Sequence, residues 1–337
     1  MNGVTAPVSI SLCVIARDEQ HVIARCLESA RPAVSEMIVV DTGSNDRTVA
    51  VAQACGARVV QAGWNDDFSL ARNRSLQEAS GDFALILDAD EELVAGAKAL
   101  AQFRAAFEEE TTWGWQLRVR NISPPAEMVQ FTDVWLTRLL RRRPGVAYES
   151  PIHEQVTPSI VRAGKRVARL DVTIRHDGYA RKEAQGASRA GRNTAALSKL
   201  AETRPTDPYV HYQLGCAHQA AGDLGKAHAS LRRARDLDCD GLPAHVRGGL
   251  ALRLSQIALR RREDREAVAL ATESLSVDPH NSIALQVLAV ASVGVGDVDG
   301  GHAAFVRLRG RPDVRPAFVA QLNQAIAALE ALVSTRR

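Results

Sequence analysis

The sequence predicts an α/β domain followed by an all-α domain of helical repeats. Short apolar runs alternate with helical segments through the first ninety or so residues, which predicts a parallel, doubly wound sheet. Strand patterns without intervening helices continue over residues 112–175 and predict a mixed or antiparallel extension of that sheet. From about residue 185 apolar and small residues recur at helical spacing instead. We therefore take residues 1–184 and 185–337 as the two domains, with the boundary near 179–191.

Strands and helices of the first domain are predicted from apolar patterning and from the residues that stop each element. Gly56 is placed to end the second helix, and Gly81 stops the third. The turn at residues 41–46 is rich in Gly, Asn and Asp. The expected strands are 8–16, 37–41, 58–61 and 83–88, and the expected helices are 18–30, 48–55 and 68–79. The extension should contain strands at 113–120, 134–140 and 167–174.

The second domain contains an internal repeat of about 40 residues. Small and apolar side chains recur at matching offsets, which lets paired helices pack closely, and such units stack as solenoids. The recurring residues are Gly215, Gly222, Ala227 and Leu231, then Ala267, Ala271 and Leu275, then Ala284, Leu288, Gly296 and Ala303.

Composition and charge are ordinary for a soluble globular protein, with 46% hydrophobic and 24% charged residues. The net charge of +3 is too small to argue for nucleic acid binding. The densest basic run is Arg141 to Arg143, which is typical of a solvated turn but could also face an anionic substrate.

Cysteine usage and hydropathy predict a cytoplasmic protein. The five cysteines form no CxxC pair, which favours a reducing compartment without a disulfide framework. No apolar run reaches the roughly 18 residues of a membrane span, and residues 1–7 lack a signal-peptide pattern. If the acceptor is linked to a lipid, the protein could also associate peripherally with a membrane.

An acidic cluster follows the apolar run that begins at Phe83. Asp88 and Asp90 are separated only by Ala89, and the carboxyl end of a strand is where open α/β sheets bind ligands. Clustered carboxylates suit hard divalent ions such as Mg²⁺ and Mn²⁺. The alternative is a strand that runs into an acidic helix start, because Asp and Glu are favoured in a first turn.

Several segments, taken in order and spacing, resemble family 2 glycosyltransferases with the GT-A fold. The matching segments are 11–19, 39–48, 68–73 and 87–91, and segments 151–154 and 176–179 fit the subgroup with C-terminal tetratricopeptide-like repeats. This resemblance covers nearly the whole chain. It implies a metal-dependent, inverting transferase that uses a nucleotide-diphosphate sugar and Mn²⁺ or Mg²⁺.

The resemblance places the nucleoside contact of the donor at Asp41, next to Ser44. The alternative is that Asp41 and Ser44 cap the following helix. Arg17 and Glu19 follow the first strand and should border the same crevice. Two further residues, Arg72 and Asn73, lie on the helix before the acidic strand; Arg72 could approach the diphosphate or be a surface residue.

The resemblance also implies which residues bind the metal ion. Asp90, the last acid of the motif, would bind the ion that bridges the two phosphates, and Asp88 would contact the ribose or the ion through water. His176 matches a histidine that related enzymes use as a further ligand or phosphate contact, although a histidine at a strand end is also typical of a structural hydrogen bond.

Transfer to an acceptor needs a general base. Glu154 occupies the place where the family usually supplies it, although many members have two acids in a row where this chain has His153 and Glu154. That departure leaves His153 and Glu149 as alternatives.

Other functions remain open at this stage. The repeats are expected to hold an acceptor (a peptide, a glycan or a small molecule), to form a homodimer, or only to support the first domain. A scaffold protein with a silent transferase domain is the main alternative. A nucleotidyltransferase lacks support because no Gly-rich basic phosphate loop follows the first strand.

Overall fold

The computed structural model describes residues 8–177, 186–237 and 241–334. The chain divides into two compact units that are not continuous along the sequence. One unit contains Met1–Ser123 and Phe131–Arg181, and the other contains Pro124–Gln130 and Lys182–Arg337. The predicted boundary between residues 184 and 185 lies outside the described residues.

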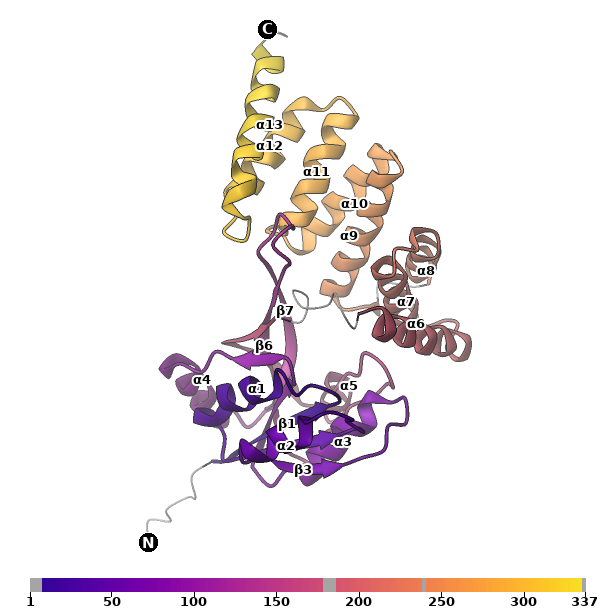
Figure 1. The fold of residues 1–337 in the computed structure, drawn as a ribbon. Helices are drawn as coiled ribbons and strands as arrows, with labels where there is room; N and C mark the ends of the chain where they lie inside the picture. The colour runs from indigo at the N-terminus through magenta and orange to yellow at the C-terminus, as the bar shows by residue number, and fades with distance from the viewer. Residues whose placement is uncertain (1–7, 178–185, 238–240, 335–337) are drawn as a thin grey trace. The chain divides into compact units, whose positions relative to one another are not determined.

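An eight-stranded sheet forms the centre of the first unit (Figure 1). Its order is β3-β2-β1-β4-β7-β6-β8-β5. The strands are β1 (Ile10–Ala16), β2 (Glu36–Asp41), β3 (Arg58–Gln61), β4 (Phe83–Asp88), β5 (Glu91–Leu93), β6 (Thr112–Ile122), β7 (Phe131–Arg141) and β8 (Arg166–His176). All seven strands predicted from the sequence are present; the short β5 was not predicted.

Both predicted halves of the sheet are confirmed. Strands β1 to β4 are parallel to one another. Beyond β4, β7 is antiparallel to β4 and β6, while β6 and β8 are parallel, so the extension is mixed. The expectation that no helix interrupts the extension is wrong, because α5 (Thr157–Arg162) lies between β7 and β8. This helix has only six residues, which is too short for a periodic apolar pattern to reveal it.

Helices cover both faces of the sheet. On one face pack α1 (Ile23–Ala30), α2 (Thr48–Ala54) and α4 (Ala97–Phe107), and on the other α3 (Phe68–Glu78) and α5. The alternation of β1 explains this arrangement, because Leu12 and Val14 join the first core and Cys13 joins the second. The sheet is therefore doubly wound, as predicted.

The first helix begins later than the sequence suggested. Residue 18 was the predicted start, but α1 starts at Ile23. Asp18 has a φ of 56°, in the left-handed region, and the carbonyl oxygen of Glu19 accepts from the N–H groups of Val22 and Ile23. Asp18 therefore turns the chain out of β1 before the helix begins, which leaves a loop at the carboxyl end of that strand.

The second unit is a series of helix pairs. Residues 124–130 belong to it: Gln130 N donates to Asp313 O at 2.6 Å, and Arg315 N donates to Met128 O at 2.8 Å. Its helices are α6 (Gly186–Thr203), α7 (Pro208–Ala220), α8 (Leu224–Asp236), α9 (Ala244–Arg260), α10 (Asp264–Val277), α11 (Ser282–Gly294), α12 (Val298–Arg309) and α13 (Pro316–Ser334).

Close helix packing in this unit depends on small residues. A Cβ atom added to Gly215 would lie 2.5 Å from Cγ of Leu231, so only glycine lets α7 and α8 approach at this point. Ala227, Ala267 and Ala271 are fully buried between helices. The recurring small residues of the sequence therefore mark helix contacts, as expected.

One helix of the described residues, α13, is long and apolar enough to cross a membrane by length and composition alone, which is weak evidence because core helices pass the same test.

The four described cysteines, at positions 13, 26, 55 and 216, are free thiols, and Cys239 lies outside the described residues. Burial raises the pKa of Cys13 to about 12, and burial also raises the pKa of Cys26.

Because a thiol reacts as the thiolate, we expect Cys13 and Cys26 to resist alkylation at neutral pH in the native protein. Cys55 is only half-buried and should react sooner. Mass spectrometry of peptides labelled before and after denaturation checks this order. Rapid native labelling of Cys13 would contradict the buried position of β1.

Three-residue loops join the helices within the pairs α7–α8, α9–α10 and α11–α12, taken here as the first, second and third pair. The middle residue of each loop has a backbone conformation in the left-handed region. Gly222 and Gly296 occupy this position in the first and third pairs, with φ values of 81° and 84°. Arg262 occupies it in the second pair, with a φ of 62°. A residue with a Cβ atom is strained there.

We expect Arg262→Gly to stabilise the protein by about 0.5–1 kcal/mol, because relief of left-handed strain exceeds the added entropy of glycine in the unfolded chain. Urea unfolding followed by circular dichroism measures the change. The matched control is Arg261→Gly, since Arg261 is a right-handed helix-end residue with a φ of −86°. That variant should be destabilised, and equal effects of the two substitutions would contradict the strain at Arg262.

Candidate active site

The candidate site lies at the carboxyl ends of β1, β2 and β4. The strand order reverses at β1, because β2 and β3 lie on one side of it and β4 on the other. Such a switch point opens a crevice in which α/β sheets bind ligands. Asp41 ends β2, Asp88 ends β4, and Arg17 follows β1 directly.

Asp41 is 1% exposed and closes a turn with its own carboxylate. One oxygen accepts from Gly43 N at 3.2 Å and Ser44 N at 3.1 Å, and the other accepts from the Ser44 hydroxyl. Helix α2 begins only at Thr48 and has no side-chain cap from either residue. The alternative in which Asp41 and Ser44 cap that helix is therefore excluded.

Hydrogen bonds join the loops that follow β1 and β2. Asp18 N donates to the Ser44 hydroxyl at 2.9 Å, and Asn45 N donates to Asp18 Oδ1 at 2.7 Å. Glu19 N donates to Thr48 Oγ1 at 2.7 Å. Arg17 is exposed beside these loops. The predicted donor residues 17, 19, 41 and 44 therefore lie together at the carboxyl ends of β1 and β2.

The acidic cluster occupies a turn and a short strand. Residues 89 and 90 form the turn after β4, and Glu91 begins β5. Helix α4 starts at Ala97 and has no acidic residue in its first turn. The acidic helix start considered from the sequence is therefore excluded.

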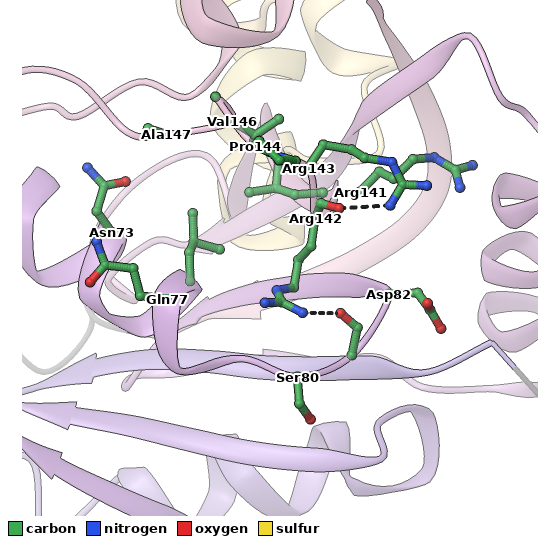
Figure 2. Close-up of a pocket in the computed structure, with 14 residues that line it drawn as sticks. Asn73, Gln77, Ser80, Asp82, Arg141, Arg142, Arg143, Pro144, Val146 and Ala147 are labelled. Atoms are coloured by element: carbon green, nitrogen blue, oxygen red, sulfur yellow. Dashed lines mark hydrogen bonds between the residues drawn. The ribbon is translucent and has the colours of Figure 1, made fainter.

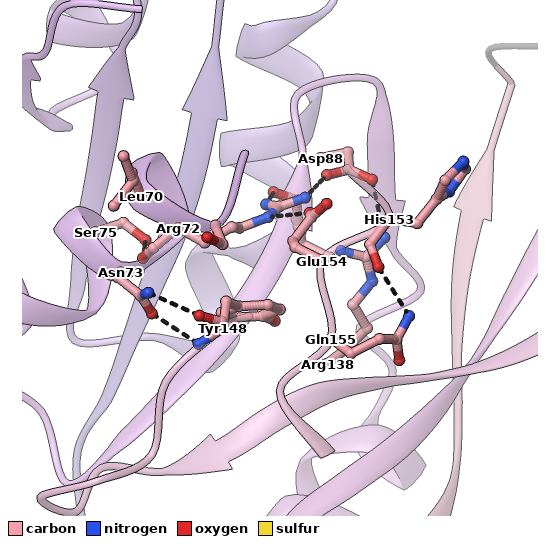
Figure 3. Close-up of polar contacts among 12 residues, drawn as sticks. Leu70, Arg72, Asn73, Ser75, Asp88, Arg138, Tyr148, His153, Glu154 and Gln155 are labelled. Carbon is pink, nitrogen blue, oxygen red and sulfur yellow. Dashed lines mark hydrogen bonds and ion pairs between the residues drawn. The ribbon is translucent and has the colours of Figure 1, made fainter. Parts of the chain in front are cut away.

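Asp88 lies between two buried arginines (Figure 3). Arg72 of α3 pairs with Asp88 Oδ1, and Arg138 of β7 donates to Asp88 Oδ2 at 2.9 Å. Burial alone would raise the pKa of Asp88, but the charges of Arg138 and Arg72 hold it well below its ordinary value. Both Asp88 oxygens are thus occupied by the protein.

Glu91 is 2% exposed and contacts the same group. Arg138 Nη2 donates to Glu91 Oε1 at 2.7 Å, and Asp88 N donates to Glu91 Oε2 at 2.9 Å. Burial, with the negative charge of Asp88, raises the pKa of Glu91 to about 7 although Arg138 opposes the shift. Glu91 therefore fixes the turn that carries Asp90.

Asp90 and His176 meet across β5 and β8. His176 Nε2 lies 3.3 Å from Asp90 Oδ2, and His176 Nδ1 lies 2.8 Å from Asn121 Oδ1 on β6. Burial lowers the pKa of His176, but the hydrogen bond and charge of Asp90 outweigh it, so the pKa is raised overall. The two predicted metal ligands are therefore neighbours.

Glu154 joins the network through Arg72, whose Nε donates to Glu154 Oε1 at 3.1 Å. Among the candidate bases it alone contacts this network in the described residues. Glu149 pairs with Arg162 instead. His153 is exposed and has a φ of 54°.

Asn73, predicted to contact the donor, holds the loop that carries Glu154 (Figure 3). Its Nδ2 donates to Tyr148 O at 2.9 Å, and its Oδ1 accepts from Tyr148 N at 2.7 Å. Pro151 O also accepts from Phe68 N at 2.8 Å, so two contacts with α3 fix this loop.

Comparison with known proteins identifies the domain. Residues 11–146 match Glycosyl transferase family 2.

These residues form a family 2 glycosyltransferase domain.

A TPR repeat-containing protein of Synechococcus elongatus is 36% identical over 234 residues, which are 68% of this chain and 57% of that protein. The chain thus spans little more than half the length of this relative. An uncharacterized glycosyltransferase of Rickettsia felis is 40% identical over 86 residues, 25% of this chain and 29% of its own length. The second unit consists of tetratricopeptide-like repeats, so the predicted fold class is confirmed.

Among solved structures, glucosyl-3-phosphoglycerate synthase of Mycobacterium tuberculosis, in complex with phosphoglyceric acid, has 19% sequence identity and a TM-score of 0.41. The match covers 57% of this chain and 79% of that one.

Three residues of the transferase domain were missed from the sequence: Glu91, Asn121 and Arg138. Arg138 stands in the apolar strand pattern before Leu139 and Leu140, where a charge needs a buried partner. That break in the apolar pattern could have marked Arg138 as a buried, paired charge. No sequence pattern could have marked Asn121, because its contact with His176 depends on the pairing of β6 and β8.

We expect Arg138→Met to destabilise the transferase domain by about 3 kcal/mol, because it leaves Asp88 and buried Glu91 without a shared cation. Chemical denaturation measures the loss. The control is Arg120→Met on the adjacent strand β6. It removes the solvent-accessible ion pair of Arg120 with Asp133 of β7 and should lower the free energy of unfolding by less than about 1 kcal/mol. Similar losses of stability in both variants would contradict a larger contribution of the buried network than of an accessible ion pair.

Proposed function

We propose that this protein is a metal-dependent, inverting glycosyltransferase that uses a nucleotide-diphosphate sugar. The observation that carries the proposal is the Asp90–His176 pair beside the Arg72–Glu154 pair within a family 2 domain. One pair is suited to a metal ion and the other to a proton transfer.

Asp90 and His176 fit a divalent ion as a two-ligand site. Mn²⁺ and Mg²⁺ accept carboxylate ligands, Mg²⁺ keeps several waters or substrate phosphates, and imidazole is the softer ligand that Mn²⁺ tolerates. Within the described residues no group of three His, Cys, Asp or Glu side chains could hold an ion, so the substrate would complete the shell. When bound, such an ion supplies Lewis-acid stabilisation of the leaving diphosphate.

The charge balance of the site also favours a cation. Four carboxylates gather here with only two guanidinium groups, so the cluster carries two excess negative charges when Glu91 is ionised and His176 is neutral, and fewer when either is protonated. The carboxylates are those of Asp88, Asp90, Glu91 and Glu154, and the guanidinium groups are those of Arg72 and Arg138. A divalent ion would neutralise this excess, which a diphosphate alone would increase.

Glu154 is proposed as the general base. Oε1 accepts from Arg72, and within the described part of the chain Oε2 has no partner. Oε2 would take the proton of the acceptor hydroxyl. The acceptor oxygen then bonds to the anomeric carbon as the bond from that carbon to the diphosphate oxygen breaks, with inversion.

The turn at Asp41 is proposed to bind the nucleoside. A carboxylate has about four acceptor positions, and three are used by Gly43 and Ser44. One acceptor position remains for a hydrogen bond from an N–H group of the base or a hydroxyl group of the ribose. Arg17 is placed to meet the diphosphate, whereas Arg72 is engaged by two carboxylates and orients them instead.

The function is tested by incubating the protein with a panel of nucleotide-diphosphate sugars and measuring released nucleoside diphosphate, with Mn²⁺ or with a chelator. We expect release that requires the ion. Asp90→Asn should abolish it without unfolding the protein, and Glu154→Gln should lower acceptor-dependent transfer by about 10²–10⁴-fold.

Two comparisons make this test specific. Glu28→Gln, at an exposed ion pair on α1, should retain full activity. Glu149→Gln should also remain active if Glu154 is the base. No release with any donor, together with capture of a partner by the repeats, would support the silent scaffold; pyrophosphate release would indicate nucleotidyl transfer.

A further inference from the structure

A pocket of the transferase domain, drawn in Figure 2, lies at the end of β4 that Gly81 and Asp82 precede. Asp88 and the candidate active site lie at the other end of this strand. The pocket has a volume of about 550 Å³ and lies between the end of α3 and the turn that follows β7. β4 has six residues and therefore spans about 20 Å. A ligand in this pocket would not reach Asp90.

Three consecutive arginines line the pocket: Arg141, Arg142 and Arg143. Their guanidinium groups donate only to main-chain carbonyl oxygens. Arg142 Nη1 donates to Gly81 O at 2.6 Å, Arg143 Nη1 to Arg142 O at 2.9 Å, and Arg141 Nη2 to Phe107 O at 3.1 Å. Within the described residues none of the three forms an ion pair with a carboxylate.

The guanidinium group of Arg141 lies on the other face of the sheet, where Nη2 donates to Phe107 O and to Glu109 O and the group stacks 4.7 Å from the centre of the Phe83 ring. Its Nε is buried and has no hydrogen-bond partner in the described structure. Burial lowers the pKa of Arg141, and the neighbouring positive charge of Arg143 lowers it further. Arg142 and Arg143 are therefore the two cations that the pocket offers to a ligand.

Asp82 is the one acidic residue in the lining. Its carboxylate accepts from Ser9 N at 3.0 Å and from the Ser9 hydroxyl at 2.9 Å. The positive charges of Arg142 and Arg143 thus outnumber the single negative charge of Asp82, which is already hydrogen-bonded. Leu76, Leu140 and Val146 add apolar surface beside them.

We propose that this pocket binds a phosphate-bearing ligand. Guanidinium groups match the geometry of phosphate oxygens and form charge-assisted hydrogen bonds with them. The volume suits a small organic phosphate or the headgroup of an anionic lipid, and the apolar lining would contact its carbon atoms. The arginine run that stood out in the sequence is then a binding element.

The pocket is physically connected to the candidate base. Asn73 lines it and also holds the main chain of Tyr148. The arginines lie on the segment that continues directly into Tyr148 and Glu154. Occupation of the pocket would restrain this segment and thereby bias the position of Glu154.

Titration calorimetry with pyrophosphate, in chelator and at constant ionic strength, tests the proposal. We expect saturable binding that Arg143→Glu weakens at least tenfold. Arg143 is exposed and contacts only its neighbour's carbonyl oxygen, so the variant should fold. Arg142→Gln should also weaken binding, while Arg74→Gln, an exposed arginine of α3 outside the pocket, should not.

Asp90→Asn separates this site from the active site. It should leave pyrophosphate binding unchanged even if it abolishes transfer, so either proposal can fail alone. Binding that is lost in Asp90→Asn, or that is unaffected by Arg143→Glu and Arg142→Gln, would overturn the pocket. A binding heat for pyrophosphate that is no larger than the heat measured with chloride at the same ionic strength would also overturn the proposal.

Vesicle sedimentation distinguishes the two sources of phosphate. Phosphatidylcholine vesicles containing phosphatidate should bind the protein in an Arg143-dependent way if a lipid headgroup is the ligand, and pure phosphatidylcholine vesicles should not. Pyrophosphate binding without vesicle binding assigns a soluble phosphate. Absence of both overturns the proposal.

Discussion

The pairing of Asp88 with Arg72 and Arg138 is the interaction on which the transferase domain depends. Asp88 ends a strand whose preceding residues are fully buried, so its charge lies at the edge of an apolar core. One arginine comes from α3 and the other from β7. The pairing therefore joins the parallel half of the sheet, its mixed extension and the helix between them at a single point.

The chemistry of the site follows from this constraint. Arg138 also contacts Glu91, which accepts from Asp88 N and so sets the turn that presents Asp90 toward His176. Arg72 also contacts Glu154 and orients it beside the same network. Asp88, which the resemblance placed at the ribose or at the ion through water, has both carboxylate oxygens engaged by arginines of the protein itself.

The sequence predicted the strands and the strand-end acids because these depend on local patterns. Asp41 and Asp90 stand where an apolar run stops, and such positions can be recognised without a structure. Arg138 and Asn121 could not be assigned roles, because their contacts depend on strand pairings between distant segments. The start of α1 was misplaced for a different reason: left-handed Asp18 interrupts a pattern that is otherwise helical.

One segment links the two ends of the sheet. Arg138 of β7 lies at the candidate site, the three arginines after it lie at the other end of β4, and the chain then returns to the candidate site at Glu154. Asn73 of α3 fastens the returning part at Tyr148, one helix residue away from Arg72. Because Arg72 and Asn73 are adjacent, the same turn of α3 contacts both the loop at Tyr148 and the ion network. The far pocket is therefore the place on this domain from which a ligand could alter Glu154 without competing with the donor.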